Sequence, residues 1–211
     1  MYRESNDRNG FTLLARKETV IIKGLSREQT NIEKANFSNE TRIMERDDDV
    51  SEVLANDVRL QYQKTFTTIR RIVETFPEDQ WLQPHGDEYY LPCRIAYHLA
   101  VVIDNYVAGG YKDKDFASKL PYGKWSEATA EILPDKATYL AYLDAVLARA
   151  NQALTLLNDE ILLSAIEPER TWMGATQMAI HLYMMRELSD HTGELNKMLI
   201  ENGLPDVWIA R

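Results

Sequence analysis

The amino-acid sequence predicts an all-α protein whose main domain is a four-helix bundle. Four stretches of similar length carry apolar residues at every third or fourth position, which is the spacing of one face of a helix. Prolines and glycines separate these stretches, and no pattern typical of a parallel sheet interrupts them. Four amphipathic helices bury their apolar faces most economically by packing on one another, which favours the bundle.

The composition excludes several classes of function. A chain of 211 residues, 45% of them hydrophobic, can form one domain with an extension. The net charge of −9 argues against a nucleic-acid-binding surface, which is usually basic. The apolar run Leu99–Ile103 is too short to cross a bilayer, so we expect no membrane partner. The single cysteine, Cys93, allows no internal disulfide, and residues 1–8 lack the apolar core of a signal peptide, so we expect a cytoplasmic protein.

The first part of the chain, residues 1–48, differs from the rest because it is polar and rich in charge. Two segments within it, Phe11–Leu14 and Glu18–Gly24, have strand-like composition and could pair into a hairpin. We therefore expect an N-terminal extension that is partly ordered or a hairpin, followed by the helical domain over residues 49–211. The extension offers no residues to which we assign chemistry.

The first helix is expected to begin near Ser51 and to end before Pro77, because the residue before a proline is disfavoured in a helix. The three aspartates at 47–49 and Ser51 offer capping groups and negative charge at its start. Its apolar positions are Leu54, Val58, Tyr62, Phe66, Ile69, Val73 and Phe76. The linker 78–90 that follows is rich in aromatic residues, which we expect to seal one end of the core.

The second helix is expected to run from Pro92, which suits a first helical turn, to the glycine pair at 109–110. The connection after it, residues 111–134, is long for a compact domain, and such connections often form lids or crossovers. We therefore expect a long crossover between helices two and three, with a short helical turn near Trp125.

The third helix is expected over residues 135–158 and the fourth over 176–202, ending at Gly203. A second linker, residues 161–172, lies between them. The tail 204–211 carries large apolar side chains, so we expect it to pack back on the domain.

The fourth helix carries the most informative pair of polar residues. Glu187 and His191 lie four positions apart, which is one turn along one face, and the apolar residues around them indicate that this face points inward. His98 lies within an equally apolar stretch of the second helix. Either histidine alone could be a core residue with a hydrogen-bond partner, but an inward carboxylate beside an inward histidine is uncommon without a cation.

The other two histidines have simpler interpretations. His85 lies in a polar linker beside Gly86, and we expect it to be solvated. His181 precedes His191 by ten residues, which is roughly 15 Å along a helix, so the two cannot share one ion and His181 is expected to be a packing or surface residue.

Two imidazoles and one carboxylate suit a borderline divalent ion such as zinc, nickel or iron. Three protein ligands leave positions open for water or substrate, as in catalytic rather than structural sites. Such an ion could lower the pKa of a bound water or hold a thiol as thiolate. The glycine loop of nucleotide-binding proteins and the Gly-x-Ser-x-Gly motif of serine hydrolases are absent from the sequence.

These residues, from about Ser51 to Gly203, resemble the DinB/YfiT-like superfamily of four-helix metalloproteins. The matching segments are Trp81, residues 95–99 around His98, and residues 187–195 with their continuation to Gly203. Most members of that superfamily have histidine where this chain has Glu187, whereas a subset similar to mycothiol-dependent maleylpyruvate isomerase has glutamate there.

The resemblance implies one divalent ion held by His98, Glu187 and His191. It also implies a small-molecule ligand, such as a low-molecular-weight thiol, and a metal-dependent transferase, isomerase or hydrolase activity. The alternative is a non-catalytic binding or assembly module whose inward histidines and glutamate only form hydrogen bonds. A homodimer is also conceivable, since the apolar tail 207–209 could serve a contact between two copies.

Overall fold

The computed structural model describes residues 52–87 and 89–208, which belong to the compact unit Asp47–Arg211. Within these residues the structure is all-α, as predicted: it contains helices and two isolated β-bridges but no strand. The expected hairpin or extension at 1–48, and the last three residues of the tail, lie outside the described residues. No helix in the described part of the chain combines the length and apolarity that crossing a bilayer requires.

Four long helices are present where the sequence predicts them. They are α2 (Val53–Thr75), α4 (Pro92–Val102), α5 (Lys136–Thr155) and α7 (Gln177–Glu201). Helix α4 continues as one turn of π-helix, Ile103–Val107, which the periodicity of the sequence does not reveal. Two short helices are also present: α3 (Glu78–Trp81) lies in the first predicted linker, and α6 (Asp159–Leu163) overlaps the start of the second.

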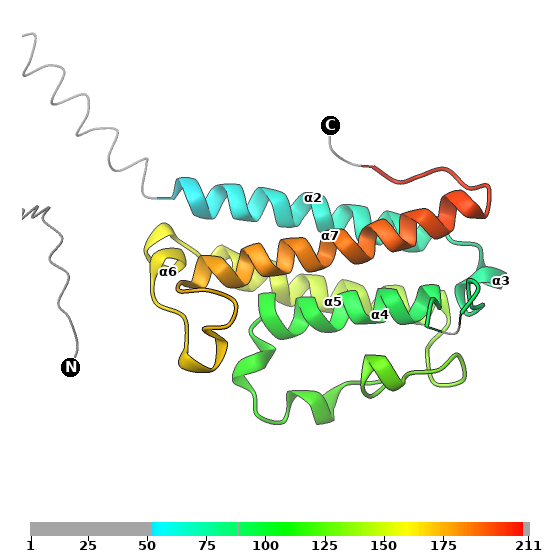
Figure 1. Cartoon of the computed structure of the whole chain (residues 1–211), viewed down its shortest axis with the longest axis horizontal. Helices are drawn as coiled ribbons and strands as arrows, with labels where there is room; N and C mark the ends of the chain where they lie inside the picture. Colours follow the sequence, from blue (N-terminus) through cyan, green and yellow to red (C-terminus); the bar gives the residue numbers. More distant parts are fainter. Residues whose placement is uncertain (1–51, 88, 209–211) are drawn as a thin grey trace, which may run out of the picture. The chain divides into compact units, whose positions relative to one another are not determined.

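The four long helices lie side by side around one core (Figure 1). Helix α2 packs against α5 and α7, and α4 packs against the same two helices. Side-chain contacts show the directions: Arg70 of α2 pairs with Asp144 of α5 and Arg59 reaches the carbonyl of Leu154, so these two helices are antiparallel.

Helices α4 and α5 are parallel, because contacts between them advance together along both helices. The hydroxyl of Tyr139 donates to the carbonyl of Ala96, and Arg149 binds Asp104. Two parallel helices cannot be joined by a tight turn. The connection between them therefore runs back along the length of α4, as Figure 1 shows, and includes the short helical turn Trp125–Glu127.

The aromatic residue that seals one end of the core is Trp81. Its ring is buried, packs on Tyr139 with 5.2 Å between ring centroids, and donates its indole N–H to the carbonyl of Pro134 at 3.2 Å. Tyr89 and Tyr90, from the same segment, do not share this role: both are exposed. The expectation that the linker aromatics seal the core together is therefore wrong for these two tyrosines.

Polar side chains bind backbone groups at the start of α2 and in the tail after α7. The predicted capping aspartates and Ser51 lie outside the described residues, but the carboxylate of Asp159 in α6 accepts hydrogen bonds from the backbone N–H groups of Leu54 and Ala55 at 3.3 and 2.9 Å. This carboxylate satisfies donors that the first turn of α2 leaves free. At the other end of the domain, the expectation that the tail packs back holds only in part. The Asn196 amide bonds both the N–H and the carbonyl of Val207, but the side chain of Trp208 is 75% exposed.

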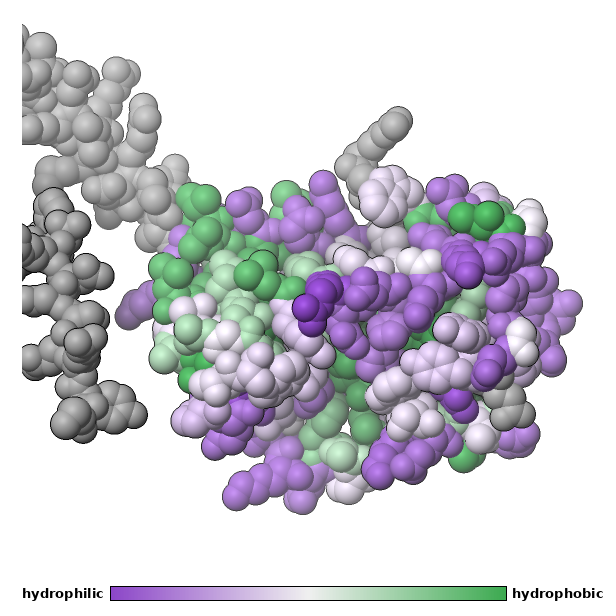
Figure 2. Space-filling model, viewed as in Figure 1, coloured by the Kyte–Doolittle hydropathy of each residue, from purple (hydrophilic) through white to green (hydrophobic). Residues whose placement is uncertain are grey.

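The surface is polar over most of the face seen in Figure 2, with apolar side chains gathered at the end where α2 begins. The exposed apolar residues of α2, α6 and α7 include Leu54, Leu163 and Leu182.

Candidate metal centre

His98, Glu187 and His191 converge between α4 and α7. One ligand atom from each residue lies within 4.8 Å of the others. The carboxylate oxygen Oε1 of Glu187 is 3.0 Å from Nε2 of His98 and 3.4 Å from Nε2 of His191. The rings of the two histidines meet edge to face, with 4.6 Å between their centroids. The structure therefore brings together all three residues that the sequence indicates as ligands.

Local helix geometry accounts for the position of each side chain. His98 lies on a helix that is buried nearly all round, and only 5% of its surface is exposed. Glu187 and His191 lie at the edge of the buried stripe of α7, one turn apart, beside the fully buried Leu188. Because α4 and α7 pack against each other, the buried histidine of one helix meets the half-buried pair of the other.

The spacing of the three groups fits a cation. A tetrahedral ion with bonds of about 2.0–2.1 Å to nitrogen and oxygen keeps its ligand atoms roughly 3.3 Å apart. Two of the three separations, 3.0 and 3.4 Å, are close to that value. Two neutral imidazoles and a carboxylate form a donor set that zinc accepts with further positions open. The residues present therefore fit one divalent ion.

The electrostatic environment keeps these groups in the protonation states that ligands need. Burial lowers the pKa of His98, although its hydrogen bond with Glu187 partly opposes the shift. Burial alone would raise the pKa of Glu187, but the hydrogen bond from His98 and the nearby His191 outweigh burial and lower it. A neutral His98 and an ionised Glu187 result, and both are the metal-binding forms.

The two histidines differ in their outer contacts. Nδ1 of His191 is 2.7 Å from a carboxylate oxygen of Glu194, which lies three residues later on α7. Such a contact fixes the ring and leaves Nε2 directed at the site. Nδ1 of His98 is buried and has no hydrogen-bond partner in residues 52–87 and 89–208. The position of His98 therefore depends on packing and on the carboxylate of Glu187.

Aromatic residues from three segments surround the triad. Trp125, in the crossover, lies against His98 with 4.0 Å between ring centroids, and Tyr89 meets the edge of Trp125. Burial and the negative charge of Glu187 raise the pKa of Tyr183, a neighbour of that carboxylate on α7.

Trp125, Tyr183 and Glu194 are neighbours of the triad that the sequence alone does not indicate. The position of Glu194 three residues after His191 is a signal that could identify it, since residues at that spacing lie side by side on a helix. Trp125 has no comparable signal, because its neighbour His98 lies on a different element.

The remaining histidines lie elsewhere. His181 is a packing residue, as expected: its ring is buried, and Nδ1 is 3.1 Å from the hydroxyl of Tyr62. The expectation that His85 is merely solvated is wrong, because its Nε2 lies 2.6 Å from a carboxylate oxygen of Glu201. This contact joins the segment after α3 to the end of α7.

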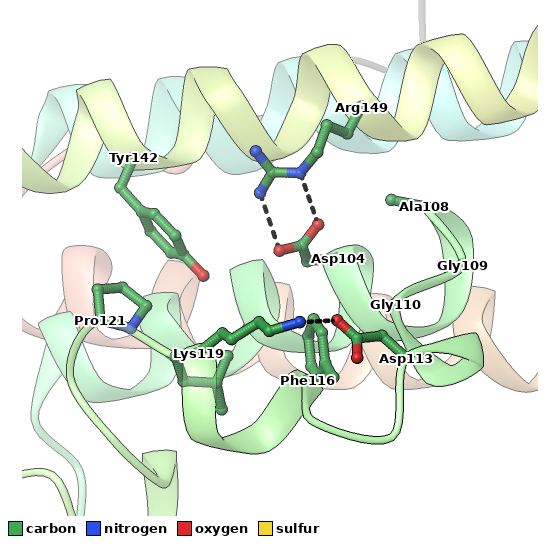
Figure 3. A pocket seen from close by; sticks show the side chains of 11 residues that line it. Asp104, Ala108, Gly109, Gly110, Asp113, Phe116, Lys119, Pro121, Tyr142 and Arg149 are labelled. Carbon is green, nitrogen blue, oxygen red and sulfur yellow. Dashed lines mark hydrogen bonds and ion pairs between the residues drawn. The ribbon is translucent and has the colours of Figure 1, made fainter.

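Figure 3 shows a cavity of about 330 Å³ between the π-helical turn, α5 and the crossover. The charged side chains that line this cavity form ion pairs with one another. Arg149 makes two hydrogen bonds with the carboxylate of Asp104, at 2.9 and 2.8 Å, and Lys119 pairs with Asp113. No charged side chain drawn in this wall is left to attract a ligand, and we assign it no function.

Comparisons with known proteins identify no relative. No protein-family model matches the chain, and no curated protein and no solved structure matches it either. Function therefore has to be inferred from the residues of the site.

Proposed function

We propose that this chain is a divalent-metal-binding protein of the DinB-like kind, with a four-helix-bundle fold, and that it acts as a metal-dependent enzyme on a small molecule. The observation that carries the proposal is the convergence of His98, Glu187 and His191, with ligand atoms within 4.8 Å of one another. Zinc, nickel and iron suit this donor set. The sequence resemblance supports the same three ligands.

The reaction class follows from the number of ligands. When bound, such an ion would lower the pKa of a water or of a thiol and so supply a nucleophile at neutral pH. This favours a hydrolase or a transferase or isomerase that uses a low-molecular-weight thiol. The chain itself contributes aromatic surface at Trp125 and Tyr183, which would contact the apolar part of a small ligand and exclude water from it. We place the protein in the cytoplasm, and a homodimer is compatible with this proposal.

Metal analysis of the full-length protein tests the proposal. Protein purified without chelators should contain about one equivalent of a divalent metal, and His98→Ala and His191→Ala should lose it. Glu187→Gln should weaken metal affinity with nearly unchanged helix content, because the amide keeps the shape of the side chain but loses its charge. Asp190→Asn is the matched control: it removes the same charge from an exposed neighbouring position and should retain the metal.

A second candidate is a non-catalytic helical module for binding or assembly. The contact of His98 with Glu187 at 3.0 Å favours it, because this hydrogen bond pairs Nε2 of His98 with the carboxylate without a cation. In that case the purified protein would lack metal, and the histidine variants would only be less stable.

A further inference from the structure

A second cavity, of about 310 Å³, lies between α7 and the loop that precedes it. The residues that line it are Trp172, Met173, Ala179, Leu182, Tyr183 and Arg186. It shares no residue with the metal centre and is therefore a separate feature of the fold. Tyr183 precedes Glu187 by one turn of α7, so the cavity and the metal centre are neighbours.

The cavity presents a large aromatic surface to the solvent. Trp172 is 63% exposed, and its ring meets the ring of Tyr183 edge to face with 5.1 Å between the centroids. Leu182, which is 64% exposed, adds an aliphatic side chain to the same wall. An apolar group of a ligand that covers this surface removes it from water, which favours binding.

Gly174 explains why the loop lies so close to α7. Its φ of +154° is one that residues with a side chain rarely adopt, and a Cβ at this position would lie 2.5 Å from the Cβ of Ala179. The N–H of Gly174 also donates to the carbonyl of Thr171 at 3.2 Å, so Trp172 lies inside a closed turn. The aromatic wall is therefore formed before a ligand arrives, which reduces the entropy cost of binding.

Arg186 supplies a positive charge at the same wall. Its guanidinium lies over the ring of Tyr183, 5.1 Å from the centroid, which positions the group and leaves its N–H donors free. Within residues 52–87 and 89–208 it forms no ion pair or hydrogen bond, although Asp190 follows it by one turn of α7. Most other arginines in these residues do pair with carboxylates, namely Arg59, Arg70, Arg149 and Arg170.

We propose that this cavity binds a small aromatic carboxylate. The planar fork of N–H donors in Arg186 matches the two oxygens of a carboxylate, and the aromatic ring of the ligand packs on the exposed ring of Trp172. The volume of about 310 Å³ is at the lower end of the range for small-molecule sites. The cavity of Figure 3 offers a contrast, because its arginine and its lysine are already paired with aspartates.

Benzoate is a suitable probe, and NMR titration of the full-length protein follows its binding. The four tryptophans give four indole N–H signals, and the signal of Trp172 is the one that Trp172→Phe removes. We expect this signal to shift saturably with a Kd in the millimolar range. Absence of saturable binding would overturn the proposal, as would saturation that leaves the Trp172 signal unshifted.

A pair of arginine variants isolates the contribution of the charge. Arg186→Gln should weaken benzoate binding about tenfold, because the carboxylate loses its charged donor. Arg71→Gln is the matched control: it makes the same change at an exposed arginine of α2 and should bind benzoate as the wild type does. Benzamide, which is neutral, should bind the wild type more weakly than benzoate and should be insensitive to Arg186→Gln. Equal affinities of benzoate for the wild type and Arg186→Gln, or equal losses in both variants, would contradict the proposal.

A metal ion at the neighbouring centre could also attract a carboxylate, so the titration is repeated after EDTA has removed the metal and has itself been dialysed away. The affinity for benzoate should be unchanged. Loss of binding in the metal-free protein would assign the carboxylate to the metal and overturn the proposal. Because the cavity does not require a metal, failure of this site and failure of the metal site are distinguishable.

Discussion

Glu187 is the residue on which the metal centre depends most. One oxygen of its carboxylate lies within 3.4 Å of both imidazoles, so it joins α4 to its own helix even without a cation. Burial opposes ionisation of this carboxyl, but the hydrogen bond from His98 and the nearby His191 outweigh burial and lower its pKa. The same contacts that stabilise the charge also hold it where a metal would bind.

Glu194 is expected to tune the metal affinity without being a ligand. We predict that Glu194→Gln weakens zinc binding by roughly 10–100-fold, because Nδ1 of His191 loses the carboxylate that orients its ring. Competition titration against a chromophoric chelator measures the affinity. Asp190→Asn removes an equal charge from the same helix and should change the affinity much less; an equal effect of both variants would mean that only net charge matters.

His181 is expected to make the stability of the protein depend on pH. Its pKa is about 4 in the folded protein and about 6.5 in an unfolded chain, so the unfolded state binds the extra proton between these values. The stability is therefore fully present above pH ~6.5 and decreases as the pH falls toward ~4, by up to ~3 kcal/mol.

Urea unfolding of the wild type and of His181→Gln at pH 7.5 and 4.5 measures this contribution. The glutamine oxygen still accepts from Tyr62 but the side chain does not titrate, so the variant should lose less stability on acidification. Parallel losses in the two proteins would show that His181 is not the group responsible.

Helix α7 combines two functions on one amphipathic element. Its fully buried side chains form part of the core, and the edge of the same stripe carries Glu187 and His191. Substitutions on α7 should therefore separate into those that change stability and those that change metal binding.

Leu188→Ala should cost about 2–5 kcal/mol in free energy of unfolding, because Leu188 is 0% exposed and its loss leaves a cavity. Leu182→Ala makes the same change at a side chain that is 64% exposed and should cost less than about 0.5 kcal/mol. Chemical denaturation measures both. A small cost at Leu188 would show that the core around the site collapses to fill the space.

The metal centre lies between two antiparallel helices, α4 and α7. Their directions follow from two contacts: His98 meets Glu187, and Tyr106, further along the chain, meets the earlier Tyr183. A cation held by His98 of one helix and by two residues of the other would connect them in the folded state alone. Binding would then stabilise the entire domain, because the three ligands are dispersed in the unfolded chain.

Zinc should accordingly raise the melting temperature. At a free concentration about 100 times the Kd the gain is about 2.7 kcal/mol, or roughly 5–10 °C for a domain of this size. Calorimetry with and without a chelator measures the shift, and His98→Ala should abolish it. A shift that persists in this variant would place the binding site elsewhere.

The sequence by itself determined the helical class, the positions of the four long helices and the three candidate ligands. These follow from periodicity and from one-turn spacing, which are local properties of a chain. Glu187 and His191 could be paired without coordinates because four residues on one helix always lie side by side.

Only the tertiary structure decided which distant groups meet. Asp159 caps α2, Glu201 binds His85, and Trp125 covers His98, across separations for which no local pattern exists. The cavity lined by Val107, Leu157 and His181 likewise appears only once several segments are packed. The physical reason is that the rotation and direction of each helix depend on burying all the apolar faces at once, a condition that involves the whole domain.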